Sequence, residues 1–312
     1  MGAFLALGEC MVELAPVAGG LYRRGFAGDS FNCAWYARRL LPSEWSVDYG
    51  TCVGNDPLSD EMLAFMQAEG IGTDGVRRID GGSVGLYMIS VRNGEREFSY
   101  WRGQSAARQM AGDLKWLDGV LKGRDMIHFS AITLAILPPK SREFFCGAIA
   151  RARKKGAIVT FDTNLRPALW ESTDAMRQGL SMGARTADIV LPSFDEDSVL
   201  FEDATPAETA ERYAALGADM VAVKHRGESL TLWQREAGLS ELQVPQVEAV
   251  VDTTAAGDSF AAGLLAGLAM GARLEEAAAQ GARLAGRVIG APGALVHEAV
   301  LPARETTGAA PG

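Results

Sequence analysis

The chain has 312 residues, of which 48% are hydrophobic and 22% are charged, so it has enough apolar side chains for a full-sized core. This composition excludes a disordered chain, a collagen-like repeat and a small disulfide-rich protein. The 30 Lys and Arg against 39 Asp and Glu give a formal net charge of −9. Such a charge does not attract polyanions, so nucleic acid is not expected as a partner, and an anionic ligand must be held by a few local cations and N–H groups.

Cysteine usage and hydropathy indicate a cytoplasmic protein without a membrane partner. The cysteines are widely separated and form no C-x-x-C pair, which predicts reduced thiols; they are Cys10, Cys33, Cys52 and Cys146. No apolar run approaches the roughly 18 residues that span a bilayer, and the first residues lack the basic region of a signal peptide. His128 is expected to be structural, and Glu9 and Glu13 are given no catalytic role.

Short apolar runs alternate with helical periodicity along most of the chain. In chain order, we expect a strand at 3–7, a helix at 31–41, a strand at 47–53, a helix at 59–69, a strand at 126–129, a helix at 140–155, strands at 158–161 and 189–191, a helix at 207–216, a strand at 220–223 and a helix at 259–270. This alternation predicts an α/β fold: an open, mostly parallel sheet with helices on both faces. Ligands in such sheets bind at the carboxyl ends of the strands.

One stretch departs from this alternation. Residues 85–91 and 95–101 are β-rich and are joined around Asn93-Gly94, a dipeptide that favours a type I′ hairpin turn. Together with residues 13–26 they are expected to form a small β lid that excludes water from a transfer reaction. The alternative is an ordinary edge hairpin. We expect one domain over residues 1–312, with the lid formed by about 13–26 and 85–101.

The sequence excludes the two common glycine-rich motifs that bind nucleotides, the dinucleotide fingerprint and the P-loop. The sequence from Gly70 to Gly75 matches G-x-G-x-x-G, but it follows a helical pattern instead of a strand, so it is not a dinucleotide fingerprint. Gly70 is better explained as the residue that ends a helix. The chain has no G-x-x-x-x-G-K-[ST] pattern, which excludes a P-loop.

The strongest motif is D-T-T-A-A-G-D-S-F-A-A-G at residues 252–263, a small-residue loop that leads into an apolar helix. Its small side chains allow the N–H groups of Ala255, Ala256 and Gly257 to converge on phosphate oxygens at the helix N-terminus. Asp258 is then placed to accept a proton from an attacking hydroxyl. The alternative is that Asp258 only caps the helix.

This motif resembles the C-terminal signature of the PfkB, or ribokinase-like, family of carbohydrate kinases, whose usual form has Gly in place of Ala255. A second element, A-G-D-S-F-N at residues 27–32, resembles the sugar-binding G-G-x-x-x-N region of that family. The resemblance covers about residues 7–302 and implies a ribokinase-like fold. Within the family, residues 8–14, 100–102 and 162–167 and the Ala255-Ala256 form of the loop resemble 2-keto-3-deoxygluconate kinases.

The resemblance implies roles for particular residues. The sugar acid would be bound by Gly28, Asp29, Asn32, Tyr87, Tyr100, Arg102 and Arg166. Asp258 would be the base, and the anion hole and ATP site would be formed by Ala255, Ala256, Gly257, Lys224, Gly227 and Ser193. The family's N-x-x-E, linked to Mg²⁺, occurs here as Ser193-Phe194-Asp195-Glu196, so Glu196 is expected near the metal, with Ser193 as a departure.

The expected reaction transfers the γ-phosphoryl group of Mg²⁺-ATP to the 6-hydroxyl of 2-keto-3-deoxygluconate. The substrate carries a carboxylate, which the planar fork of an arginine can hold, although Arg102 and Arg166 could instead be surface residues. One alternative is a neutral-sugar kinase of the fructokinase or ribokinase type, and another is a non-catalytic protein that binds sugar acids. The resemblance leaves open a K⁺ ion behind the Asp252 loop. A lid offers a docking surface to a second copy, so we expect a homo-oligomer.

Overall fold

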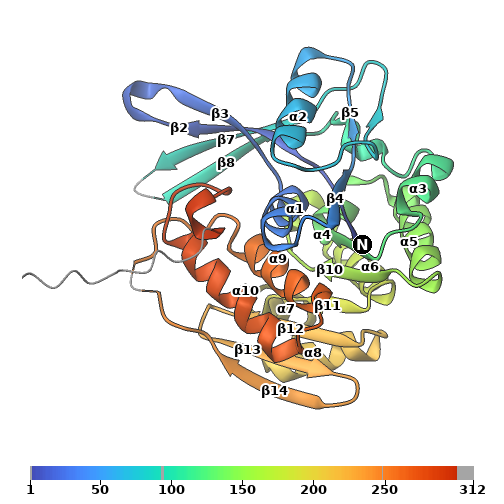
Figure 1. Ribbon diagram of the computed structural model, residues 1–312, viewed down its shortest axis with the longest axis vertical. Coiled ribbons are helices and arrows are strands. Elements are labelled where there is room, and N and C mark those ends of the chain that lie inside the picture. The colour runs from blue at the N-terminus through green and yellow to red at the C-terminus, as the bar shows by residue number, and fades with distance from the viewer. Residues whose placement is uncertain (1, 93–94, 248, 301–312) are drawn as a thin grey trace, which may run out of the picture.

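The central feature of the computed structural model is an eight-stranded sheet in the order β14-β13-β12-β11-β10-β9-β1-β4 (Figure 1). The structure describes residues 2–92, 95–247 and 249–300. Neighbouring strands from β4 to β12 pair in parallel, and β13 and β14 add an antiparallel edge. The strands are β1 (Gly2–Leu7), β4 (Trp45–Gly50), β9 (Met126–Ser130), β10 (Ile158–Asp162), β11 (Ile189–Leu191), β12 (Met220–His225), β13 (Ser229–Gln234) and β14 (Gly238–Gln243).

Helices cover both faces of this sheet, because side chains that alternate along each strand point to opposite faces. Leu5 and Leu7 of β1 belong to one buried cluster, whereas Phe4 and Ala6 belong to the other. Helices α3 (Leu114–Leu121), α5 (Pro139–Lys154), α6 (Thr173–Arg185) and α8 (Pro206–Ala215) contribute to the first cluster. Helices α1 (Asp29–Leu40), α2 (Pro57–Ala68), α9 (Ala256–Ala269) and α10 (Leu274–Ile289) contribute to the second. Short helices α4 (Ala131–Ile136) and α7 (Phe194–Phe201) follow β9 and β11.

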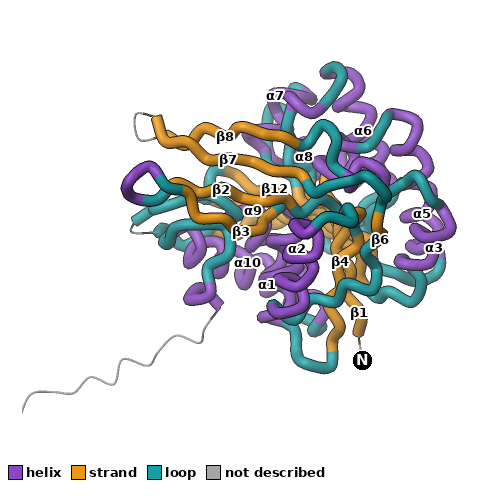
Figure 2. The backbone as a smooth tube through the Cα atoms, turned by 90° about the horizontal axis from the view of Figure 1, so that it is seen from above, coloured by secondary structure: helices purple, strands orange, loops and turns teal. Residues whose placement is uncertain are grey.

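A second sheet has the strand order β3-β2-β7-β8 and projects from one side of the molecule (Figure 2). It consists of β2 (Met11–Pro16), β3 (Tyr22–Ala27), β7 (Gly85–Arg92) and β8 (Glu95–Trp101). We call this sheet the lid. Its strands cover the two segments from which the sequence predicts a small sheet. The turn expected at Asn93 and Gly94 lies outside the described residues.

The observed topology confirms the predicted fold class, although the predicted elements omit helices such as α3, α6 and α10 and differ from the structure in two strand regions. The expected strand at 47–53 is divided: β4 ends at Gly50, and β5 (Cys52–Val53) pairs with β6 (Arg77–Arg78) in a separate two-stranded sheet. A continuous apolar run does not reveal that its pairing partner changes. The antiparallel pair β13 and β14 was also absent from the predicted elements, because β14 is largely exposed and has no apolar pattern.

Helix α2 ends as its glycine predicts. The last helical residue is Ala68, and Gly70 adopts a left-handed conformation with φ of +77°. Its N–H donates to the carbonyl of Gln67 at 3.0 Å, and the N–H of Ile71 donates to Met66 at 2.9 Å. Gly70 therefore ends a helix, as expected, and has no part in nucleotide binding. Among the described residues, no helix combines the length and the apolar character needed to cross a bilayer.

Candidate active site

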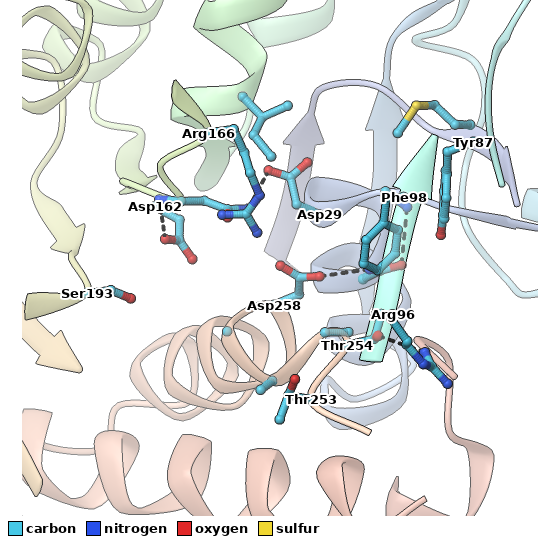
Figure 3. Close-up of a pocket in the computed structure, with 18 of the residues that line it drawn as sticks. Asp29, Tyr87, Arg96, Phe98, Asp162, Arg166, Ser193, Thr253, Thr254 and Asp258 are labelled. Atoms are coloured by element: carbon cyan, nitrogen blue, oxygen red, sulfur yellow. Dashed lines mark hydrogen bonds between the residues drawn. The ribbon is translucent and has the colours of Figure 1, made fainter. Parts of the chain in front are cut away.

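A cavity of about 770 Å³ lies beside the lid, where β1, β10, β11 and β12 end and where α1 and α9 begin (Figure 3). Most of the predicted site residues line it: Gly28, Asp29, Asn32, Tyr87, Tyr100, Arg102, Arg166, Ser193, Glu196, Lys224, Ala255, Ala256, Gly257 and Asp258. Gly227 does not line the cavity; it lies in the turn after β12 with φ of +70°. The fold thus brings together residues from seven separate segments that the sequence presents far apart.

Asp258 is the third residue of α9, and Ala255 occupies the N-cap position. The Asp258 carboxylate accepts a hydrogen bond from Nδ2 of Asn32 at 2.7 Å instead of capping a backbone amide. The alternative explanation of Asp258 as the helix cap is therefore wrong. Burial, followed by the negative charge of Asp29, raises the pKa of Asp258 well above the range of an ordinary carboxyl group. Its proton affinity is consequently higher than that of an exposed aspartate.

The loop before α9 is organised around the buried carboxylate of Asp252. Its oxygens accept hydrogen bonds from the N–H of Thr254 at 3.0 Å, the Thr254 hydroxyl at 2.7 Å and the N–H of Gly293 at 2.6 Å. Although burial opposes ionisation, these bonds lower the pKa of Asp252 below its ordinary value. Ala255 follows in the left-handed region with φ of +61°, a conformation that its Cβ disfavours. The hydrogen bonds of Asp252 thus stabilise a strained loop.

The predicted anion-binding amides are not equivalent. The N–H of Ala256 donates to the carbonyl of Thr253 at 3.2 Å and closes a turn. The N–H groups of Ala255 and Gly257 have no hydrogen-bond acceptor among the described residues. These two amides, at the N-terminus of a 14-residue helix, are the ones available to an anion.

The residues around Asp29 form a polar wall of the cavity. The Asp29 carboxylate accepts hydrogen bonds from the Ser130 hydroxyl and from Nδ2 of Asn164, the latter at 3.1 Å. Gly28 precedes Asp29 against the chain after β1, where a Cβ would lie 2.2 Å from the carbonyl oxygen of Glu9. Only glycine permits this close approach, which places Asp29 and Asn32 at the start of α1.

The two predicted carboxylate-binding arginines have different partners. Arg102 is buried, and its Nε donates to Oε2 of Glu9 at 2.8 Å, while its Nη2 bonds to the same oxygen. Arg166 is half-exposed, and its Nη1 donates to the carbonyl of Leu165 at 2.6 Å and to Oε1 of Glu196 at 3.3 Å. Both arginines line the cavity. Arg102 is already neutralised by a buried carboxylate.

The predicted tyrosines lie next to each other on the lid. Tyr87 and Tyr100 are paired across β7 and β8, with ring centroids 5.9 Å apart. The Tyr87 hydroxyl donates to the Glu13 carboxylate, so that hydroxyl is already engaged. Tyr100 is half-exposed and leaves part of its surface facing the cavity.

Several cavity residues had no role assigned from the sequence: Glu9, Arg96, Phe98, Asp162 and Asn164. Asp162 accepts hydrogen bonds from Nζ of Lys224 at 3.2 and 3.3 Å. The position of Asp162 at the end of a predicted strand was a usable signal, and so was the period-two spacing of Arg96 and Phe98 with Tyr100. The sequence contained no comparable signal for the pairing of Glu9 with Arg102.

His128 and the cysteines lie outside the cavity lining. His128 is buried and bonds through Nδ1 to the Thr160 hydroxyl at 2.8 Å, which confirms that it is structural; burial lowers its pKa. In the part of the chain that the structure describes, no group of three or more His, Cys, Asp or Glu residues is arranged to hold a metal ion. The four cysteines are buried free thiols.

Comparison with known proteins places this site in a family. Residues 4–298 match the model of the pfkB family carbohydrate kinase. The chain belongs to this family. It is 37% identical to a 2-dehydro-3-deoxygluconokinase of Haemophilus influenzae, covering 95% of this chain and 96% of the relative, and 38% identical to one of Dickeya dadantii, covering 95% and 97%.

A solved structure supports the same assignment. The crystal structure of a PfkB protein from Polaromonas sp. JS666 superposes with a TM-score of 0.81 and 28% sequence identity. The match covers 93% of this chain and 96% of the other. The predicted family and its ribokinase-like fold are therefore confirmed.

Proposed function

We propose that the protein is a 2-keto-3-deoxygluconate (2-dehydro-3-deoxygluconate) kinase that uses ATP to phosphorylate the 6-hydroxyl. The observation that carries the proposal is the position of Asp258, which faces a cavity between two free amides of the α9 N-terminus and the polar wall of Asp29 and Asn32. Near full-length similarity to relatives named for this activity supports the choice of substrate.

The reaction requires one bond to form and one to break. The 6-oxygen of the sugar acid forms a bond to the γ-phosphorus, the bond from that phosphorus to the ADP oxygen breaks, and the hydroxyl proton passes to Asp258. A carboxylate of raised pKa suits this step because its proton affinity is closer to that of the reacting group. The hydrogen bond from Asn32 holds the carboxylate in place.

Phosphate charge would be met by groups on the side of the cavity formed by the main body of the protein. We call this side, which carries Asp162, Arg166, Lys224 and Asp258, the floor. The amides of Ala255 and Gly257 point from a helix N-terminus, where anions are stabilised. Lys224 adds a cation, and its pairing with Asp162 holds Nζ at the end of β12. Mg²⁺ usually binds one or two carboxylates together with phosphates and water, and Glu196 and Asp162 offer such oxygens in the same cavity. Bound there, the ion would neutralise charge on the transferred phosphoryl group.

The substrate carboxylate is expected to bind mainly at Arg166. Its ion pair with Glu196 is long and half-exposed, so a ligand carboxylate can compete for the guanidinium at little cost. Arg102 has Nε and Nη2 committed to buried Glu9, and it would contribute through its remaining donors. This division refines the expectation that the two arginines act alike.

The test is ADP release from Mg²⁺-ATP measured over a panel of sugar acids and neutral sugars. We expect the highest kcat/KM with 2-keto-3-deoxygluconate and identification of the product as the 6-phosphate. A preference for fructose or ribose would instead support a neutral-sugar kinase. Binding of the sugar acid without turnover would support the non-catalytic alternative.

The expected homo-oligomer stays a prediction with a physical basis in the lid. Leu21, Tyr22 and Trp101 are large apolar side chains that remain exposed there. Light scattering of the purified protein would measure the molecular mass in solution.

A further inference from the structure

Arg96 lies on β8 near the outer end of the lid. Its strand pairs with β7 from Leu86↔Trp101 near the body to Arg92↔Glu95 at the outer end, and Arg96 pairs with Val91. Arg96, Phe98 and Tyr100 alternate along β8 and line the cavity. The side chain of Arg96 therefore points from the lid toward the floor of the site (Figure 3).

The guanidinium of Arg96 reaches the loop before α9. Its Nη1 lies 2.7 Å from Oδ2 of Asp252 and donates to the Thr254 hydroxyl at 3.1 Å. The Asp252 side chain is only 2% exposed, whereas that of Arg96 is 33% exposed. The lid thus supplies a cation to the buried carboxylate around which the loop is organised.

This contact matters because the loop is strained. Ala255 holds a left-handed conformation that a residue with a Cβ adopts only when its surroundings enforce it. The hydrogen bonds of Asp252 to Thr254 and Gly293 provide that constraint from the body. Arg96 adds a charge-assisted bond to the same carboxylate from the lid.

We propose that Arg96 is a positioning residue that couples closure of the lid to the shape of the 252–255 loop. The amides of Ala255 and Gly257 are then correctly placed for phosphate only while the lid covers the cavity. The kinetic consequence of this coupling rests on the proposed kinase function. When the coupling is lost, water can replace the sugar hydroxyl as acceptor: the bond to ADP breaks, the phosphorus bonds to the water oxygen, and ADP, inorganic phosphate and a proton are released.

The kinetic test compares Arg96→Ala with Arg92→Ala, a lid arginine whose side chain is 75% exposed and pairs with Glu97. For Arg96→Ala we expect kcat/KM for the sugar acid to fall by roughly ten- to a hundredfold, through both kcat and KM. ADP should also exceed sugar phosphate, whereas wild type and Arg92→Ala should form them one to one. Arg96→Lys keeps the charge and should recover part of the loss.

A second measurement is independent of substrate and activity. Hydrogen exchange of the ligand-free proteins should be faster in Arg96→Ala at both 95–101 and 252–258, and unchanged there in Arg92→Ala. If wild type does not phosphorylate the sugar acid but this paired loosening occurs, the proposed function fails and the coupling stands. Unchanged exchange at 252–258 overturns the coupling. Paired loosening with wild-type kcat, KM and ADP ratio overturns the positioning role.

Discussion

The floor and the lid of the cavity are stabilised in different ways. Floor residues such as Asp162 and Lys224 lie at or next to the last residue of strands of the central sheet, whose apolar side chains are buried on both faces. On the lid, Phe98, Tyr100 and Trp101 remain between 41% and 58% exposed. The comparison shows that the groups proposed for phosphoryl transfer lie on elements packed between two buried clusters, whereas the lid keeps large apolar side chains exposed and reaches the body through a few polar contacts.

The arginines of the two regions show the same contrast. Arg102, at the base of the lid, forms a pair with Glu9 in which both side chains are at least nine-tenths buried. Arg166, on the floor, forms a pair that is 49% and 40% exposed. Removing one partner of a buried pair leaves an uncompensated charge, whereas an exposed pair contributes little to stability. Arg102 should therefore matter more for folding, and Arg166 more for ligand binding.

The largest expected effect lies on the floor. Asp258→Asn keeps the shape of the side chain and removes the base, so kcat should fall by about 10²- to 10⁴-fold. ATP binding and the melting temperature should change little. Asp174→Asn, in the first turn of α6 with an 82% exposed side chain, is the matched control. Turnover of Asp258→Asn within a few-fold of wild type would contradict the assignment of the base.

Arg102→Ala tests the base of the lid. It leaves the Glu9 carboxylate buried without its partner, and the free energy of unfolding in urea should fall by about 3 to 5 kcal/mol. The double variant Glu9→Gln/Arg102→Ala should recover part of this loss, because no buried charge remains. Arg166→Ala should lose less than about 1 kcal/mol. Equal losses for the two single arginine variants would remove the distinction between the pairs.

Arg166→Ala tests ligand recognition on the floor. The kcat/KM for 2-keto-3-deoxygluconate should fall by about ten- to a hundredfold, because one charge-assisted bond to the carboxylate is lost. The value for fructose should change much less. Arg235→Ala, which removes an exposed pair with Asp219 outside the cavity, serves as the control. The same proportional loss on both sugars would show that Arg166 does not bind the carboxylate.

A smaller effect is expected on the pH dependence of kcat/KM, which depends on the ionisation of Asp258. Asp258 must be ionised to accept the proton, so kcat/KM should fall as pH decreases through its raised pKa. Removing the neighbouring charge with Asp29→Asn lowers the pKa of Asp258 and should move this acidic limb to lower pH. The pH at which kcat/KM falls can be measured even if Asp29→Asn lowers the overall activity. An unmoved limb would mean that another group controls it.

The smallest expected effect concerns the strained loop between the two regions. Glycine adopts the conformation of Ala255 without the penalty of a Cβ, but it also gains freedom in the unfolded chain. Ala255→Gly should therefore raise the free energy of unfolding by only about 0.5 to 1 kcal/mol. Ala256→Gly, at the first residue of α9, should lower it, because glycine gains freedom in the unfolded chain without relief of strain. A loss of stability in Ala255→Gly would show that its conformation is not strained.

Much of the fold could be predicted from local patterns. Alternation of apolar runs with helical periodicity identified β1, β9, β10 and β12, because buried strands and amphipathic helices each leave a pattern in consecutive residues. The pairing of β5 with β6 could not be predicted in this way. It depends on contacts between Cys52 and Arg77 that periodicity does not encode.

The sequence by itself determined the loop and the helix start that carry Asp258, because the small residues that allow this conformation are consecutive. Only the tertiary structure decided the partners of the charged side chains. Arg102 and Glu9 are 93 positions apart, and Arg96 and Thr254 are 158 positions apart. Each of these side chains had several oppositely charged or polar candidates in the sequence. The choice among them depends on how the lid packs on the body, which local patterns do not specify.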